Sequence, residues 1–489
     1  MPTSRAKFGR DVVIAGLAAA LKSTRNLLML PLLTHSLSLA EYGIWEQIMA
    51  GVALLLPWVS LQLSGALMQF LPGQSDRAQA QETFYSAFSL AAGFSLFCGL
   101  LLWLCAPLLE PYPYFALFMA NASPVAALIP LSVMVGMVVS YFRASRLMVR
   151  HSLLTLVQNF GEIGLIASVL VSGEGLREAL VSLAAARGLL LAFGGTMLIL
   201  HLGWRWPHFR QLRAYLAFSI PQIPHSSFYR IFDLADRYIL NYWLGPAAVG
   251  LYSIAYTSAG FFITVLYPIH LVLLPALAEL WNTRQLGEMG AYATHALRYS
   301  CLIGFPCLAG LCAFPLPILD LLVPRSYAGA ALYLPALAAG FLLYGIAIPA
   351  EHVVLISGRT KLLLLLNGIL AGANVLCNLV LVPLIGLWGA VLATLIGQIY
   401  YAVAVLVFAR RALPFRLPWK EALRYGACAL VMALLLVRLN AFVPVPILLL
   451  VLAGGALYLA LLLLSRSISP AEIRYFAGLM TGRGYGRAG

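Results

Sequence analysis

Charged residues are scarce in this sequence. Only 10% of its 489 residues are Asp, Glu, Lys or Arg, while 62% are hydrophobic and the mean hydropathy is +0.91. This composition excludes a soluble globular chain. Strand-like alternation of apolar and polar residues is also missing, which excludes an outer-membrane β-barrel.

Sequence motifs for catalysis and metal binding are missing too. The chain has no Walker-A loop, no His-Glu-x-x-His and no Ser-His-Asp order, so ATP-driven transport by this chain alone is not favoured. Its seven cysteines lie in apolar stretches without metal-ligand spacing, and we interpret them as core residues. We expect no cofactor, no metal and no enzymatic activity. The basic residues behind the net charge of +14 occur singly in short loops and do not form the clustered face that nucleic-acid binding needs. No nucleic-acid partner is therefore expected.

Long apolar stretches recur along nearly the whole chain instead. Each is long enough to cross a hydrocarbon layer of ~30 Å as a helix. We therefore predict an all-α polytopic membrane protein with about fourteen transmembrane helices. The first stretch mimics a signal peptide, but its apolar run continues through Leu33, which favours an uncleaved first span. The predicted spans are 11–33, 43–69, 83–109, 115–142, 152–172, 177–202, 214–242, 247–275, 293–318, 330–356, 362–382, 387–409, 421–439 and 444–465.

The basic residues predict the orientation of these spans. With a cytoplasmic N-terminus, 23 of the 31 Lys and Arg residues fall in inner segments, and only Arg177, Arg325 and Arg438 fall in outer ones. The positive-inside rule then places both termini in the cytoplasm. The membrane expected to hold the protein is the inner (cytoplasmic) membrane of the cell.

An internal repeat divides the chain. A shift of 207 positions lays Leu37 on Leu244, Ala40 on Ala247, Gly43 on Gly250 and Trp45 on Tyr252. We predict two pseudo-symmetric six-helix lobes, 1–205 and 206–412, that enclose a V-shaped cavity, with two extra helices and a cytoplasmic tail in 413–489.

Basic residues inside the spans are the candidate substrate-binding groups. They are Lys22 and Arg25 in the first span, Arg187 in the sixth, and Arg230 and Arg237 in the seventh. Charge at mid-membrane is costly when it faces lipid, so these side chains should face a protein interior or a water-filled cavity. Arginine binds phosphate in bidentate fashion, which suits an anionic substrate.

Acidic residues inside the spans leave two interpretations open. Asp233 shares a helix face with Arg230 and Arg237, and Asp236 lies at its edge, so these acids are either structural ion pairs or sites of ion coupling. Glu162 and Glu351 have no evident partner in the sequence and are further candidates for ion coupling. Glu46 is interpreted as a helix-end residue near water.

Aromatic residues gather at the predicted outer ends of the paired helices. An interfacial belt is the default interpretation, and sugar stacking is the alternative. The residues are Tyr42, Trp45, Tyr242, Trp243, Tyr252 and Tyr256.

Three stretches carry a resemblance to a known family: LPLLTHSLSLAEYG at 30–43, SGRTK at 357–361 and GLWGAVLAT at 386–394. In this order and spacing the chain resembles polysaccharide-type flippases of the multidrug/oligosaccharidyl-lipid/polysaccharide (MOP, MATE-like) exporter superfamily. The resemblance implies outward flipping of an isoprenoid-pyrophosphate-linked oligosaccharide by alternating access, for polysaccharide biosynthesis. It also implies three partners: the polyprenyl pyrophosphate substrate, membrane lipids and polysaccharide polymerase machinery.

Other functions remain as alternatives. A drug/cation antiporter of the same superfamily would favour a cavity of carboxylates, and the basic excess in spans one, six and seven argues against it. A membrane-embedded polymerase or glycosyltransferase would need an acid/base pair on the outer face. The outer loops offer five acids without a paired motif: Glu41, Glu110, Glu174, Glu178 and Asp320.

Overall fold

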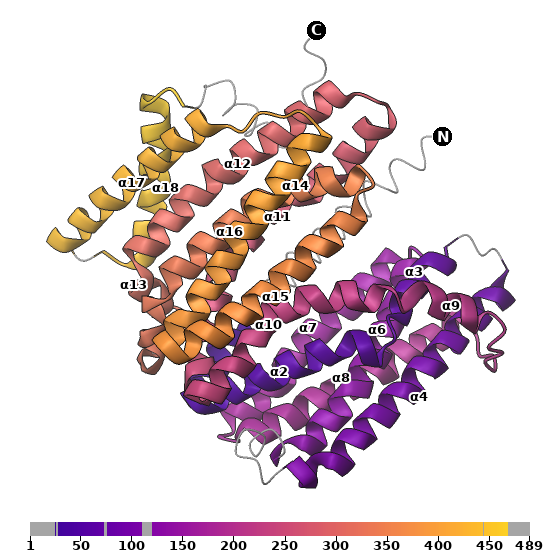
Figure 1. Cartoon of the computed structure of the whole chain (residues 1–489). Helices are drawn as coiled ribbons and strands as arrows, with labels where there is room; N and C mark the ends of the chain where they lie inside the picture. Colours follow the sequence, from indigo (N-terminus) through magenta and orange to yellow (C-terminus); the bar gives the residue numbers. More distant parts are fainter. Residues whose placement is uncertain (1–24, 26–27, 73–75, 110–119, 444, 468–489) are drawn as a thin grey trace. The chain divides into compact units, whose positions relative to one another are not determined.

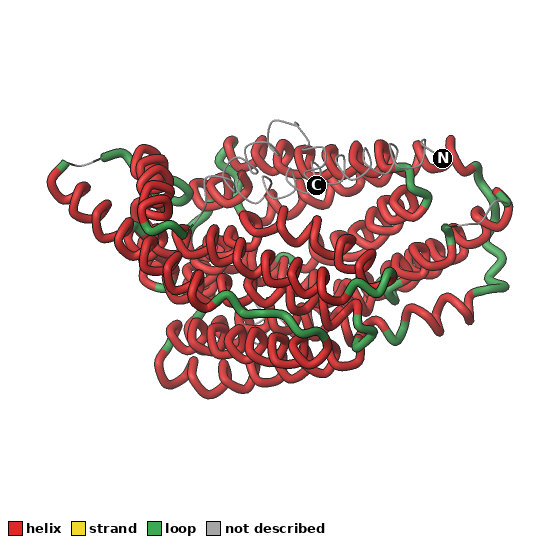
Figure 2. Tube along the Cα trace, turned by 90° about the horizontal axis from the view of Figure 1, so that it is seen from above, coloured by secondary structure: helices red, strands yellow, loops and turns green. Residues whose placement is uncertain are grey.

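The protein is helical throughout the part that the structure describes. The computed structural model describes residue 25 and residues 28–72, 76–109, 120–443 and 445–467, and these hold helices, turns and loops but no strand (Figure 2). The predicted all-α class is confirmed.

The chain forms two compact units (Figure 1), and we call them unit 1 and unit 2. Unit 1 comprises Met1–Ile254, Leu322–Tyr327 and Asn367–Ala393. In its core, α6 packs against α2, α3, α4, α7 and α8. The helices that lie wholly in unit 1 are α2 (Leu39–Val59), α3 (Leu63–Phe70), α4 (Arg77–Leu109), α6 (Ala122–Ala144), α7 (Met148–Val171), α8 (Leu176–Leu202), α9 (Leu212–Ser219) and α10 (Gln222–Leu244).

Unit 2 comprises Ala255–Leu321, Ala328–Leu366 and Thr394–Gly489. There α12 packs against α13, α14, α17 and α18. The helices wholly in unit 2 are α12 (Leu286–Ala313), α13 (Pro315–Leu319), α14 (Leu334–Ile356), α17 (Trp419–Phe442) and α18 (Ile447–Leu464). Four elements pass from one unit to the other: α11 (Pro246–Asn282), η1 (Arg325–Leu332), α15 (Thr360–Ile385) and α16 (Leu387–Ala412). The predicted lobe boundaries stay a prediction.

Twelve helices among the described residues are long and apolar enough to cross a membrane. The 23-residue α10 is not one of them, because its charged residues lower its hydropathy. The first predicted span, 11–33, lies mostly outside the described residues. These two segments and the twelve helices correspond to the predicted fourteen.

Two predicted spans are each broken into two helices, and the prediction of single continuous helices was wrong there. Span 43–69 consists of α2 and α3, because Leu61 and Gln62 between them adopt left-handed φ angles of 50° and 49°. Span 214–242 consists of α9 and α10, which meet at Pro221, a residue without a backbone N–H. Hydropathy averaged over the length of a span does not register either break, because a change of backbone direction leaves the average unchanged.

Two glycines that the 207-residue shift aligns lie against each other's helix start. A Cβ atom on Gly43 of α2 would lie 1.8 Å from the carbonyl oxygen of Pro246, and one on Gly250 of α11 would lie 2.5 Å from the carbonyl oxygen of Leu39. Any side chain at either position would therefore push the backbones apart.

Candidate functional site

An ionic group joins Arg25 to three helices of unit 1. The Arg25 Nη2 atom lies 2.6 Å from Oε2 of Glu162 on α7, and Nε of Arg187 on α8 lies 3.3 Å from Oε1 of the same carboxylate. Arg187 also donates to the Ser132 hydroxyl on α6. We call Arg25, Glu162, Arg187 and Ser132 the Arg25–Glu162–Arg187 group.

This group carries excess positive charge in the interior of unit 1. Two guanidinium groups share one carboxylate, whose side chain is only 3% exposed. The Nε atom of Arg25 is buried and has no hydrogen-bond partner among the described residues. An uncompensated cation inside a span is costly unless an anion or water reaches it, so the group is suited to hold an anion.

The expectation that Glu162 lacks a partner was wrong. Its two arginine partners lie 137 and 25 residues away in the sequence, on other helices. A search for partners within one helical turn cannot find them.

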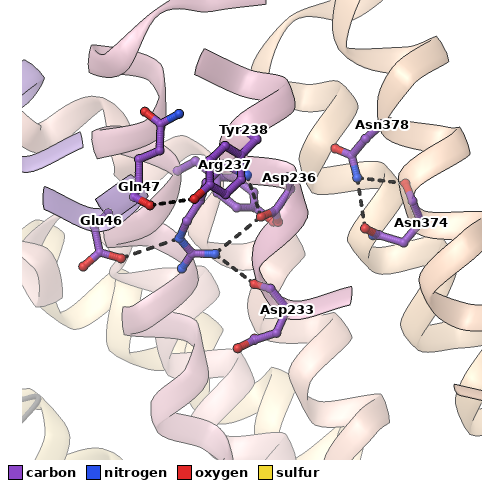
Figure 3. Close-up of polar contacts among 9 residues, drawn as sticks. Glu46, Gln47, Asp233, Asp236, Arg237, Tyr238, Asn374 and Asn378 are labelled. Carbon is purple, nitrogen blue, oxygen red and sulfur yellow. Dashed lines mark hydrogen bonds and ion pairs between the residues drawn. The ribbon is translucent and has the colours of Figure 1, made fainter. Parts of the chain in front are cut away.

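A second ionic group surrounds Arg237 on α10, and Figure 3 shows it lying between two carboxylates. Its Nε atom lies 3.6 Å from Glu46 of α2, and its Nη1 atom lies 3.4 Å from Asp236 and donates to the Asp233 carbonyl oxygen at 2.9 Å. The Tyr252 hydroxyl donates to Asp236. Because the Arg237 and Asp236 side chains are 5% and 0% exposed, this group ties α2 to α10 as an internal support.

Three predicted site residues remain outside these groups. Arg230 is half-buried on α10, and no described carboxylate lies within ion-pair distance of it. Glu351 on α14 of unit 2 is half-buried and hydrogen-bonded by the Tyr401 hydroxyl, also without an ion pair to a described cation. Lys22 lies outside the described residues.

The interfacial-belt interpretation was wrong for four of the six aromatic residues. Tyr42, Trp45, Tyr252 and Tyr256 are buried, and the belt interpretation suits only the exposed Tyr242 and Trp243. The buried hydroxyls serve the ionic group around Arg237: Tyr252 bonds Asp236, and Tyr42 bonds Glu46. An interfacial belt and a buried cluster around an ion pair can use the same aromatic residues. The sequence alone therefore did not distinguish the two arrangements.

Two buried amides on α15 were missed. Asn374 and Asn378 are 1% and 0% exposed, and Nδ2 of Asn378 donates to the backbone oxygen of Asn374 at 2.9 Å and to its Oδ1 atom at 3.2 Å (Figure 3). Their spacing of four residues in an otherwise apolar helix was the available signal.

Unit 2 contains an apolar cavity of about 630 Å³ between α12, α13, α17 and α18. Its walls include Leu302, Pro306, Phe314, Met432, Leu450 and Tyr458. The Tyr458 hydroxyl donates to the Leu302 carbonyl oxygen at 3.0 Å. Because this hydroxyl is already hydrogen-bonded, the tyrosine contributes its apolar ring to the cavity wall.

Charge buried inside membrane-spanning helices is typical of membrane transport proteins. Comparison with known proteins agrees with this class of protein. Residues 8–281, more than half of the chain, match the family model described as "Polysaccharide biosynthesis protein". The chain therefore belongs to the polysaccharide biosynthesis protein family. Residues 221–380 also match the family model MatE, and no curated protein matches the chain by sequence.

Solved structures share the fold at low sequence identity. One described as lipid II flippase MurJ in an inward closed conformation has a TM-score of 0.76 and 14% identity, over 93% of this chain and 98% of that one. An inward-facing multidrug resistance MATE family transporter of the MOP superfamily has a TM-score of 0.64 and 15% identity, over 80% and 93%. A MOP superfamily transporter from Pyrococcus furiosus has a TM-score of 0.57 and 15% identity, over 83% and 94%. The predicted MOP superfamily resemblance is confirmed.

Proposed function

We propose that the protein is a flippase that carries an isoprenoid-pyrophosphate-linked oligosaccharide from the cytoplasmic to the outer leaflet of the inner membrane, for biosynthesis of a polysaccharide such as O-antigen. The observation that carries this proposal is the excess positive charge of the Arg25–Glu162–Arg187 group inside unit 1. The family description names polysaccharide biosynthesis, and one structure of the same fold is a lipid II flippase.

Arg25 and Arg230 are the proposed contacts for the pyrophosphate. Arg25 is the more exposed arginine of its group, at 27% against 14% for Arg187, so it is the one that can turn toward a ligand. Arg187 is held by Glu162 and Ser132 and would position the carboxylate. Arg230 lacks a described ion-pair partner and would supply a second guanidinium fork from α10.

Supporting roles go to the remaining cations. Lys22 belongs to the same predicted face as Arg25 and would add charge there. Arg237 is already engaged by Glu46 and Asp236, so we assign it to holding α10 in place and not to direct contact with the substrate.

The apolar cavity of unit 2 would receive part of the isoprenoid tail. Its walls are almost wholly apolar, and it lies among α12, α17 and α18, which are all long and apolar enough to span a membrane. A polyprenyl chain is a flexible hydrocarbon that gains free energy wherever it leaves water or fills an apolar cavity.

The membrane potential can drive this movement. In a cell with a negative interior, an anion that moves outward gains about 2.3 kcal/mol per charge per 100 mV. A headgroup with two negative charges would gain roughly 4–5 kcal/mol. The protein then has only to offset the cost of removing the pyrophosphate from water, which is what buried arginines provide.

The test is a flipping assay with a labelled lipid-linked oligosaccharide in liposomes. Arg25→Ala and Arg230→Ala should each slow flipping by about a hundred-fold or more, since each removes a desolvated contact to the pyrophosphate. Arg177→Ala is the matched control, because Arg177 is an exposed arginine in the first turn of α8. Flipping should also accelerate under a potential that favours outward movement of anions. Arginine variants that flip at the wild-type rate would contradict the proposed binding site.

The drug/cation antiporter remains the second candidate, because the group around Arg237 sets two carboxylates against one arginine. A cationic drug would need access to Asp236, whose side chain is 0% exposed and already bonded by Tyr252. Uptake of a fluorescent cationic drug that depends on Asp236, together with no flipping of the lipid-linked sugar, would establish the antiporter instead.

A further inference from the structure

A second basic site lies in unit 1, where five helix ends meet. A cavity of about 680 Å³ opens between the end of α3, the start of α4, the turn from α6 to α7 and the end of α8. Arg77, Tyr141, Arg146 and His201 line its polar side. We call this cavity the Arg77–Arg146 pocket.

Arg77 is fixed in the wall of this pocket. Its Nε atom donates to the Leu202 carbonyl oxygen at 2.9 Å, and its Nη2 atom donates to the His201 carbonyl oxygen at 3.3 Å. These carbonyls belong to the last turn of α8, which ends at Leu202 and is followed by Gly203 with φ of +81°. The guanidinium therefore stabilises the negative end of α8 and stays at the pocket.

Arg150 and Arg146 add two more cations. Arg146 lines the pocket in the turn between α6 and α7, and Arg150 follows it by four residues in the first turn of α7. The Nη1 atom of Arg150 is buried and has no hydrogen-bond partner among the described residues. Leaving a buried guanidinium N–H without an acceptor is costly, so an acceptor should come from outside the described chain.

Ion-pair partners for these arginines are missing among the described residues. None of Arg77, Arg146 and Arg150 forms an ion pair with a carboxylate in the described part of the chain. The nearest acid in the sequence is Asp76, whose carboxylate accepts from the Ala78 N–H at 2.9 Å at the start of α4. The α7 N-terminus, which begins at Met148, also has no side-chain cap and adds its positive end to the site.

We propose that the Arg77–Arg146 pocket binds a phosphate group, presented by the headgroup of an anionic membrane lipid. The helices α4, α6, α7 and α8 are long and apolar enough to span a membrane, so their ends lie at the depth of lipid headgroups. The pocket joins its arginines to apolar residues such as Leu71 and Leu147, which suits a phosphate attached to a glycerol backbone.

This site is separate from the proposed flipping site. Glu162 follows Arg150 by twelve residues on α7, which corresponds to roughly 18 Å along the helix axis. A single phosphate cannot contact both arginine groups, so each can be tested without disabling the other.

The experiment measures lipid binding to the full-length, delipidated protein by native mass spectrometry. Phosphatidylglycerol, phosphatidylcholine and inorganic phosphate are the three probes. The wild-type protein should bind phosphatidylglycerol about ten-fold more tightly than phosphatidylcholine, and the double variant Arg146→Gln/Arg150→Gln should lose this preference. Arg284→Gln is the matched control, because Arg284 is also exposed, sits in a helix–helix turn and has a similar left-handed φ of 58° against 55° for Arg146.

The outcomes separate the sources of the phosphate. Arginine-dependent binding of phosphatidylglycerol supports the proposal in full, whereas arginine-dependent binding of inorganic phosphate alone supports a phosphate site and overturns the lipid headgroup as its source. Equal binding of both lipids by wild type and variant, with no phosphate binding, would overturn the site itself, as would an equal loss in Arg284→Gln. If the double variant does not fold, the exposed Arg146→Gln single variant gives the same comparison.

Discussion

The two units differ in the groups that surround their buried titratable side chains. In unit 1, the deeply buried carboxylates Glu162 and Asp236 each lie against an arginine. In unit 2, Glu351 is hydrogen-bonded by Tyr401, and His270 and His352 lie with their ring centroids 6.3 Å apart; none of the three forms an ion pair with a described residue. The ion pairs described above for Arg25, Arg187 and Arg237 therefore all lie in unit 1.

This difference shows that apolar helices of one chain can bury different polar groups. Gly43 and Gly250, which the 207-residue shift aligns, lie against each other's helix starts, and both belong to unit 1. The units do not coincide with the predicted lobes, because Arg25, Glu162 and Arg187 fall in lobe 1–205 and Asp236 and Arg237 in lobe 206–412, although all five lie in unit 1. Under the proposed function, unit 1 would receive the anionic headgroup, and the apolar cavity of unit 2 would receive part of the hydrocarbon tail.

The largest effect should come from removing the charge of Glu162. Glu162→Gln leaves Arg25 and Arg187 buried together without a counter-ion, which should cost about 3–5 kcal/mol. The melting temperature in detergent and the amount of protein in the membrane report this loss. The double variant Glu162→Gln/Arg187→Gln should cost less than the sum of the single variants, and additive costs would show that the ion pair does not stabilise unit 1.

A smaller loss is expected where the starts of α2 and α11 lie against each other. Gly43→Ala places a methyl group against the Pro246 carbonyl, and the resulting overpacking should cost about 2–3 kcal/mol. Gly93→Ala on α4 is the control, because no atom lies within 4 Å of its added Cβ. Equal melting temperatures for the two variants would mean that the close contact of the helix starts is not maintained in the membrane.

The hydrogen bond from Tyr252 to Asp236 should matter somewhat less. Tyr252→Phe removes a donor from a fully buried carboxylate and should cost about 1–3 kcal/mol, whereas Tyr267→Phe, at an exposed position on α11, the helix that also carries Tyr252, should change stability by less than about 0.5 kcal/mol. Thermal melts of both variants give the comparison. Equal losses would place Asp236 in contact with water and remove its role as an internal support.

Much of the fold followed from the sequence, because hydropathy alone marks membrane helices. The charged face of α10 was also predicted, since Arg230, Asp233 and Arg237 are close in the sequence. The partners Glu162 of Arg25 and Glu46 of Arg237 could not be predicted in this way, because helix packing brings them together from distant segments. The break at Leu61 was missed because it depends on local backbone angles that leave no trace in hydropathy.

The smallest effect should come from Glu351, which makes it the sharpest test of the difference between the units. Burying a carboxyl group that has no cation beside it costs little free energy only when the group is protonated. Glutamine has nearly the same shape and polarity as that neutral form. Glu351→Gln should therefore cost less than about 1 kcal/mol and change the rate of flipping by less than about three-fold, in contrast to the same substitution at Glu162. Thermal stability, membrane abundance and flipping rate should be measured for both variants side by side. If Glu351→Gln stopped transport at normal abundance, unit 2 would be supplying the energy coupling through this carboxylate, and the assignment of the essential charges to unit 1 would have to be revised.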